Sequence, residues 1–187
     1  MQQADPRNWW WKCFFITYVS QQPMLVGVCL PLWAINFDAA KTPFSPLDLL
    51  ATILCVAGLT IAYFADTQLR EFMLENEARA AMGKGPIPLL YRGLWKYSRH
   101  PNYFGEQLWW WSLVLYAVVV HQGWTVIGTL FNSIVMAQVT VMTEQKMVEK
   151  PSRREAYAAY QKATSVWLPL PPGHLDPKYY TPDSDKA

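Results

Sequence analysis

The chain has 187 residues, of which 52% are hydrophobic, 15% aromatic and only 16% charged, whereas an ordinary soluble domain carries roughly 25% charged residues. Its ten Trp, ten Tyr and eight Phe exclude a disordered chain, because disordered segments are poor in aromatic residues. A net charge of +2 argues against a nucleic-acid partner. Three cysteines without a CxxC pair and three scattered histidines favour neither a disulfide framework nor a metal site.

Charged residues are absent from three long stretches, at 13–37, 49–65 and 107–143. A helix that crosses a bilayer needs about 20 apolar residues at roughly 1.5 Å each, so the third stretch suits two such helices. The sequence therefore predicts an all-α, polytopic membrane protein with about four spans, at residues 13–37, 47–66, 102–120 and 124–143. Pro23 and Pro31 should make the first span the least regular. A soluble helical core is the disfavoured alternative, because soluble helices keep a polar face.

Basic residues are distributed unequally between the connecting segments. The predicted loop at 67–105 holds six Lys and Arg and the segment after Thr143 holds seven, whereas the two other loops hold only Lys41. By the positive-inside rule, both termini and the long loop are expected to be cytoplasmic. No removable signal peptide is predicted. Residues 1–168 are expected to form one membrane domain and residues 169–187 a proline-rich, flexible tail.

Polar residues that suit a binding site are densest at 93–106, with the sequence GLWKYSRHPNYFGE. Pro101 fits the first position of a helix, and Arg99 beside that helix N-terminus suits phosphate. Gly105 lets a helix or a ligand approach the backbone closely, and Glu106 is an acid at the membrane boundary, where acids face a partner or a cavity. The alternative is that these residues only anchor the span at the interface.

Two further groups of residues lie at the ends of predicted spans. Asp66 and Arg70 are four residues apart and would share a helix face, either as a plain ion pair or as groups that bind a ribose hydroxyl and a phosphate. Tyr157 and Tyr160 follow the fourth span and form one aromatic face of a short helix. The alternative for this helix is a surface amphipathic helix at the membrane interface.

Taken in order, the segment 65–69 (ADTQL), the segment 93–106 and the Tyr157/Tyr160 stretch resemble the C-terminal region of the steroid 5-alpha-reductase-like family. The resemblance covers about residues 8–170 and is greatest to a branch found in bacteria, plants and algae. It implies an oxidoreductase of CH–CH groups in the endoplasmic reticulum or another internal membrane. Such an enzyme takes hydride from NADPH to reduce an activated C=C bond in a steroid or other lipid, with a protein acid polarising the carbonyl.

The resemblance also assigns residues to the cofactor site. Asp66, Trp95, Asn102, Tyr103 and Glu106 match positions that line the NADPH site, and Tyr160 falls near the family's C-terminal cofactor contacts. We add Arg70 and Arg99 as ligands for phosphate charge. No catalytic residue is assigned, because the family's longer members supply the substrate-binding acid and tyrosine from further N-terminal spans. The chain is therefore expected to be a fragment or a shortened member that binds the cofactor.

Two other functions remain open from the sequence. The first is an S-adenosylmethionine-dependent membrane methyltransferase of the isoprenylcysteine or phospholipid type, whose motif around Arg99-His100-Pro101 is similar. Those enzymes tend to carry adjacent glutamates after the last span, whereas Glu144 is followed by Gln145. The second is a non-catalytic membrane subunit, which would need a partner protein. In every case the bilayer is an expected partner, and a lipid or steroid is the expected substrate of an enzyme.

Overall fold

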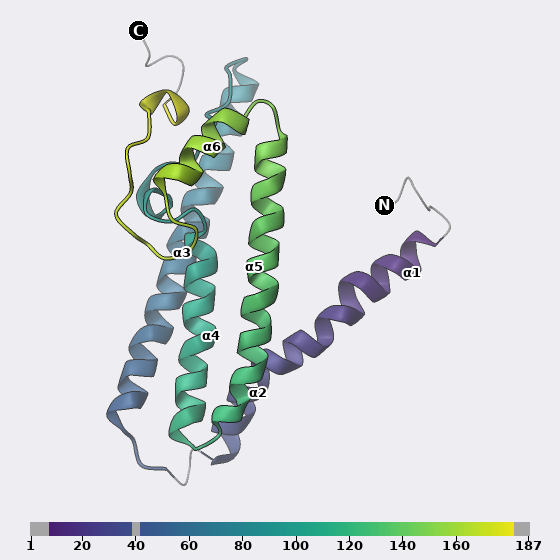
Figure 1. The fold of residues 1–187 in the computed structure, drawn as a ribbon, viewed down its shortest axis with the longest axis vertical. Helices are drawn as coiled ribbons and strands as arrows, with labels where there is room; N and C mark the ends of the chain where they lie inside the picture. Colours follow the sequence, from purple (N-terminus) through teal and green to yellow (C-terminus); the bar gives the residue numbers. More distant parts are fainter. Residues whose placement is uncertain (1–7, 39–41, 182–187) are drawn as a thin grey trace. The chain divides into compact units, whose positions relative to one another are not determined.

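A computed structural model describes residues 8–38 and 42–181, and this part of the chain is helical without a named strand (Figure 1). The prediction of an all-α protein is confirmed. The helices are α1 (Trp9–Cys13), α2 (Gln22–Asp38), α3 (Pro46–Ala81), α4 (Pro101–Val119), α5 (Val126–Glu149) and α6 (Arg154–Ala163). A π-helix (Phe14–Tyr18) and short 3₁₀ helices (Val19–Gln21, Gly93–Lys96, Gly123–Thr125 and Pro177–Tyr179) connect or extend them.

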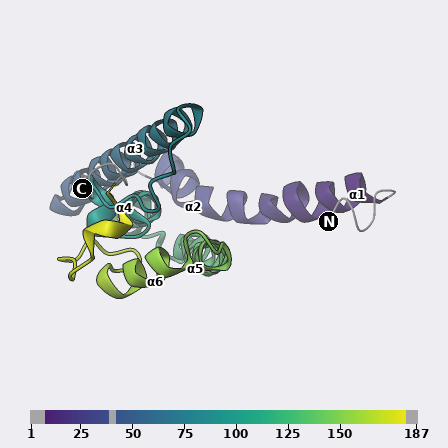
Figure 2. The same cartoon turned by 90° about the horizontal axis from the view of Figure 1, so that it is seen from above.

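The chain forms two compact units. Unit 1 comprises residues 1–53 and 110–135, and unit 2 comprises residues 54–109 and 136–187. Within unit 1, α2 contacts α5 where Gly27 meets Gly128, and the ring of Trp33 lies against that of Trp124, with centroids 6.4 Å apart. Within unit 2, Figures 1 and 2 both show α6 beside the C-terminal end of α5.

Among the described helices, α3 and the segment Gly123–Glu149 are long and apolar enough to cross a membrane. Only 11% of the most apolar window of α3 and 28% of that of the second segment are buried in the structure. A core helix of a soluble protein would bury most of this surface. On α3, large side chains such as Val56, Leu59 and Phe64 are exposed. Length, composition and exposure therefore favour two membrane-crossing helices.

The first predicted span, at 13–37, is irregular in the structure. The chain passes from α1 through the π-helix and a 3₁₀ turn into α2, which contains Pro31 in its interior. The irregular part is residues 14–21, whereas α2 continues through Pro31 over 17 residues. Proline removes one backbone donor from the helix but does not end it here.

The helix that contains the second predicted span continues beyond it. The sequence predicts a loop from residue 67, but α3 continues without interruption to Ala81. Residues 67–81 are rich in Leu, Glu, Arg and Ala, which favour helix, and contain neither Gly nor Pro. The helix stops just before Gly83, which has a φ of +70°, a backbone conformation that glycine adopts readily. The prediction of a loop is therefore wrong for residues 67–81. The prediction that a helix starts at Pro101 is confirmed, because α4 begins there.

In unit 2, α3 and α4 approach each other backbone to backbone at two glycines. A Cβ atom on Gly105 would lie 2.6 Å from the amide nitrogen of Ala62 and 2.6 Å from the carbonyl oxygen of Gly58. A Cβ atom on Gly58 would lie 2.7 Å from the Gly105 carbonyl oxygen. Small residues permit this close approach between helices in membranes. The expectation that Gly105 admits a close neighbour is confirmed, and that neighbour is α3.

This contact predicts the effect of adding one methyl group. Gly105→Ala should lower stability by about 1–3 kcal/mol, because the helices must separate to admit the methyl group. That loss corresponds to a fall of several degrees in the thermal midpoint of the detergent-solubilised protein. The matched control is Gly123→Ala, where the nearest atom to a Cβ is 3.6 Å away. Equal midpoints for the two variants would contradict the close packing of α3 on α4.

The C-terminal segment packs within unit 2. The sequence predicts a flexible tail at 169–187, whereas Leu175 is 5% exposed and lies in the same cluster as Tyr157 and Tyr160. The Gly173 amide donates to the Ala163 carbonyl at 2.7 Å, and the Tyr179 hydroxyl donates to Glu155 at 2.6 Å. Apolar side chains placed between the prolines give this segment a surface to bury. Residues 182–187 lie outside the described residues.

Candidate functional site

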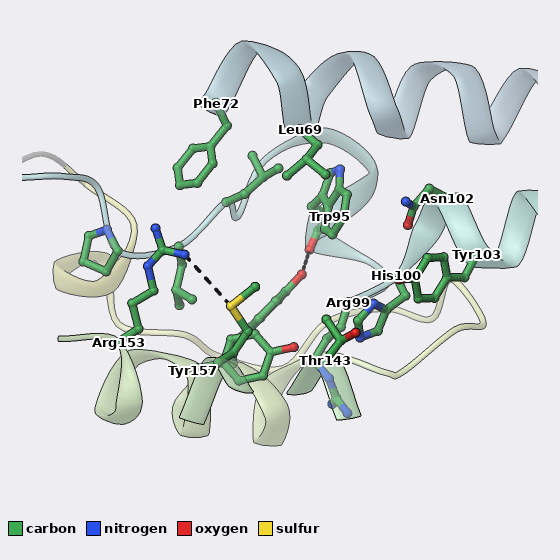
Figure 3. Close-up of a pocket in the computed structure, with 15 residues that line it drawn as sticks. Leu69, Phe72, Trp95, Arg99, His100, Asn102, Tyr103, Thr143, Arg153 and Tyr157 are labelled. Carbon is green, nitrogen blue, oxygen red and sulfur yellow. Dashed lines mark hydrogen bonds between the residues drawn. The ribbon is translucent and has the colours of Figure 1, made fainter. Parts of the chain in front are cut away.

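A cavity of about 190 Å³ lies in unit 2, and Figure 3 shows the side chains around it. Its lining comes from α3, the segment that follows it, the start of α4, the end of α5, and α6 with the residue before it. The lining residues are Leu69, Phe72, Pro88, Leu89, Leu90, Trp95, Arg99, His100, Asn102, Tyr103, Thr143, Met147, Arg153, Tyr157 and Tyr160. Among these described residues are two arginines and no carboxylate. The cavity is therefore largely apolar and aromatic, with its formal charge entirely positive.

Trp95 is fixed by hydrogen bonds to α3. Its indole Nε1–H donates to the carbonyl oxygen of Ala65 at 3.0 Å, and the backbone amide of Leu94 donates to Oε1 of Gln68 at 2.9 Å. Gly93 precedes them with a φ of +56°, and a Cβ there would lie 2.5 Å from the Gln68 side chain. Glycine is therefore needed for the turn that lays the Trp95 ring along the cavity.

Asn102 lines the cavity and carries an acceptor that is unpaired among the described residues. Its side-chain amide donates to Oδ1 of Asp66 at 3.0 Å. Because a carboxylate only accepts hydrogen bonds, this contact fixes which end of the amide is nitrogen. The remaining atom, Oδ1 of Asn102, is buried and has no hydrogen-bond partner among the described residues. An unpaired buried acceptor costs free energy, and a ligand that donates an N–H or O–H removes that cost.

Arg99 is neutralised by Glu144. Its Nε and Nη2 donate to the two oxygens of the Glu144 carboxylate at 2.7 and 3.1 Å. Nη1 donates to the carbonyl oxygens of Gln161 and Thr164 at 2.9 and 2.6 Å. The two charged side chains are 8% and 13% exposed. This fork-to-fork geometry is the strongest form of an arginine ion pair, and it ties the start of α4 to α5 and α6.

His100 shares the same carboxylate. Its Nε2 lies 3.1 Å from Oε1 of Glu144, and its ring stacks on Tyr103 with centroids 5.1 Å apart and planes 11° apart. The backbone amides of Arg99 and His100 donate to the carbonyl oxygens of Ser165 and Val166 at 2.9 and 3.0 Å. These contacts hold the residues before α4 against the segment that follows α6.

Tyr157 and Tyr160 form the aromatic wall on α6. Their rings are in edge-to-face contact with centroids 5.9 Å apart, and both side chains are buried. The Tyr160 hydroxyl donates to the carbonyl oxygens of Trp95 and Ser98. Burial raises the pKa of both phenols above its usual range, and the carboxylate of Glu144 adds to the effect on the pKa of Tyr157. Tyr160 therefore serves as a neutral donor that joins α6 to the segment before α4.

The structure brings five of the eight predicted cofactor residues to the cavity: Trp95, Arg99, Asn102, Tyr103 and Tyr160. Asp66 is exposed and contacts the cavity only through Asn102. Arg70 is exposed and Glu106 is half-buried, and neither is among the lining residues. Within the described part of the chain, no ion pair joins Asp66 to Arg70, and the Asp66 carboxylate accepts from Asn102.

Arg153 is a site residue that the sequence did not indicate. It immediately precedes α6, is half-buried, and lines the cavity. Across the described residues, no carboxylate lies within ion-pair distance of its guanidinium, and Nη1 meets only the Met147 sulfur, at 4.0 Å. The available signal was the Arg153-Arg154 pair after the fourth span. The sequence alone does not show which of the two arginines turns inward.

Comparison with known proteins gives the family. Neither the curated proteins nor the solved structures contain a significant match to the chain. The family described as "Protein of unknown function (DUF1295)" matches residues 1–164. The match includes every residue that lines the cavity, from Leu69 to Tyr160. The chain therefore belongs to the DUF1295 family.

Proposed function

We propose that the chain is a membrane-embedded, NADPH-binding member of a steroid 5-alpha-reductase-like family. It would act on an activated C=C bond in a steroid or other lipid. The observation that carries the proposal is the Oδ1 atom of Asn102, a buried and unpaired acceptor held by Asp66 at an aromatic, positively charged cavity. When bound, NADPH would supply a hydride for the carbon beta to the lipid carbonyl, and a proton would complete the reduction.

The residues present fit part of this cofactor. The amide group of nicotinamide and the amino group of adenine both carry N–H donors that match the free acceptor of Asn102. Trp95, Tyr103 and Tyr157 provide faces for a flat heterocycle. Pockets that enclose a drug-sized ligand have volumes of about 300–1,000 Å³, so a cavity of about 190 Å³ suits one half of a dinucleotide. The other half would extend beyond it.

The charge of the cavity distinguishes this proposal from the methyltransferase alternative. S-adenosylmethionine carries a sulfonium and an ammonium against one carboxylate, whereas NADPH carries several phosphate charges. Among the described lining residues there is no carboxylate, and Arg153 carries a positive charge that Glu144 does not neutralise. A positive field in the cavity favours an anion over a cation. Glu144 is the residue that most nearly matches the adjacent glutamates of the methyltransferases. Its carboxylate already contacts Arg99, His100 and Gln161 at hydrogen-bond distance.

The proposal includes four membrane spans. Four segments would cross the bilayer. They are the irregular helical region that ends in α2, the apolar part of α3, the whole of α4, and α5. The distribution of basic residues would place both termini and the cavity on the cytoplasmic side. An internal membrane such as the endoplasmic reticulum would bring a lipid substrate beside a water-soluble cofactor. This arrangement leaves the substrate-binding acid to another segment or to a partner subunit.

Cofactor binding tests the proposal directly. Titration of NADPH into the detergent-solubilised chain should quench tryptophan fluorescence saturably, because Trp95 lines the cavity. Asn102→Ala should weaken binding by about 1–3 kcal/mol, because the donor of the ligand loses its buried partner. The matched control is Asn132→Ala, a buried asparagine of unit 1, which should leave NADPH affinity unchanged.

The same titration separates the alternatives. Saturable binding of S-adenosylmethionine without binding of NADPH would favour the methyltransferase. Binding of neither ligand by a folded protein would favour a non-catalytic membrane subunit. An unchanged NADPH affinity in Asn102→Ala would contradict the assigned site even if NADPH binds.

A further inference from the structure

The cavity contains two arginines with different surroundings. Arg99 is committed to the protein, because Glu144 and two backbone carbonyls accept from all three of its guanidinium nitrogens. Among the described residues, the Arg153 guanidinium meets only a thioether sulfur, which is a weak acceptor and carries no charge. A half-buried guanidinium without an anion retains most of its capacity to bind one. The positive charge available to a ligand in this cavity therefore belongs to Arg153.

Arg153 is also placed apart from Asn102. Figure 3 shows the two side chains at opposite sides of the group of lining residues, with Trp95 and Tyr157 between them. The cavity thus offers an anion-binding group at one side, a free hydrogen-bond acceptor at the other, and aromatic rings in between. A mononucleotide has the complementary order of groups: a heterocycle with an N–H donor, a ribose, and a phosphate.

We propose that Arg153 is the phosphate-binding residue of this cavity, and that the cavity holds one mononucleotide half of the cofactor between Arg153 and Asn102. The inference rests on the proposed NADPH-binding function and specifies it further. It moves the phosphate role from Arg99 and Arg70, to which the sequence assigned it, to a residue that precedes α6. Because the phosphate would contact Arg153 and the heterocycle would contact Asn102, the two ends of the nucleotide can be tested separately.

Neighbouring basic residues do not provide the same group. Arg154 is exposed, and its Nε donates to the carbonyl oxygen of Val148 at 3.1 Å. Arg92 pairs with Glu75 at 2.9 Å, and the Nε of Arg79 donates to the carbonyl oxygen of Gly85 at 2.9 Å. None of the three lines the cavity. Arg154 is therefore a suitable control, since it adjoins Arg153 and carries the same charge.

The experiment compares nucleotide fragments with and without phosphate, as competitors of NADPH on the detergent-solubilised full chain. One pair is reduced nicotinamide mononucleotide and reduced nicotinamide riboside, and the other is adenosine 2′,5′-bisphosphate and adenosine. In the wild type, the phosphate-bearing member of at least one pair should bind about tenfold to a hundredfold more tightly. Whichever pair shows this difference identifies the half of the cofactor that the cavity holds.

Arg153→Gln should abolish the difference by weakening only the phosphate-bearing fragment. Arg153→Lys should retain part of the affinity difference, because lysine keeps the charge but lacks the planar guanidinium. This variant also serves as a folding control for Arg153→Gln. Arg154→Gln should leave the difference intact. Equal weakening of both members of a pair, or no change, would overturn the role of Arg153. In that case NADPH binding by the wild type would still support the proposed function, whereas no NADPH binding by a folded wild type would refute the proposed function itself.

Discussion

Glu144→Ala is expected to lower the free energy of unfolding by about 3–5 kcal/mol, the largest effect among the polar substitutions considered for this protein. The alanine variant leaves the buried guanidinium of Arg99 without its anion, and His100 and Gln161 also lose their acceptor. Removing one partner of a buried ion pair costs far more than the pair contributes, because a desolvated charge remains. Thermal or denaturant unfolding of unit 2, followed by tryptophan fluorescence in detergent, measures the loss.

Two comparisons identify the cause of that loss. Gln145→Ala changes the next residue, which is exposed, and should be nearly neutral. The double variant Arg99→Met/Glu144→Gln should be more stable than the sum of its single changes indicates, because it removes both charges together. A loss below about 1 kcal/mol for Glu144→Ala would match an exposed pair and would contradict the buried arrangement.

Trp95→Ala is expected to combine a large loss of stability with a loss of the cavity wall. Trp95 is 9% exposed and packs with Phe72, Ile87 and Leu90. Truncating a buried tryptophan to alanine costs about 3–5 kcal/mol, because both apolar contacts and the filled volume are lost. The variant should unfold at a lower temperature and should lose most of the NADPH-dependent quenching, and both effects can be measured on the same preparation.

Trp95→Phe separates packing from the hydrogen bond. Phenylalanine retains an aromatic ring but lacks the indole N–H that donates to the carbonyl oxygen of Ala65. That carbonyl keeps its backbone partner inside α3, so the lost hydrogen bond should cost about 0.5–1.5 kcal/mol. NADPH affinity should fall less in this variant than in Trp95→Ala. If both variants retain full affinity, Trp95 supports the fold without contacting the cofactor.

Local features of the fold could be predicted because they depend on neighbouring residues. The charge-free stretches identified the apolar helices, and Pro101 marked the start of α4. The same local logic failed for residues 67–81. There the end of the apolar stretch predicts the end of the helix, whereas residues with high helix propensity continue α3 to Ala81. A charged residue ends a stretch suited to the bilayer but does not end a helix.

The candidate site could be predicted only in part. Trp95, Asn102 and Tyr103 reach the cavity, and all three belong to one contiguous segment whose composition marked it as a site. The partner of Arg99 lies 45 residues away, on α5, and no local pattern identifies it. The expected phosphate role of Arg99 depended on that partner, because an arginine held by a carboxylate has little charge left for a ligand.

The sequence by itself determined the all-α class, the apolar helices and the segment from Gly93 to Glu106, because these follow from composition, spacing and helix propensity. Only the tertiary structure decided which side chains share the cavity. The backbone contact between Gly58 and Gly105 brings α3 against α4 in unit 2, and the Arg99–Glu144 pair joins the start of α4 to α5. These long-range contacts turn Arg153 and Asn102 toward one cavity and leave Arg70 exposed, since the direction of a side chain on a helix has meaning only after the helices have packed.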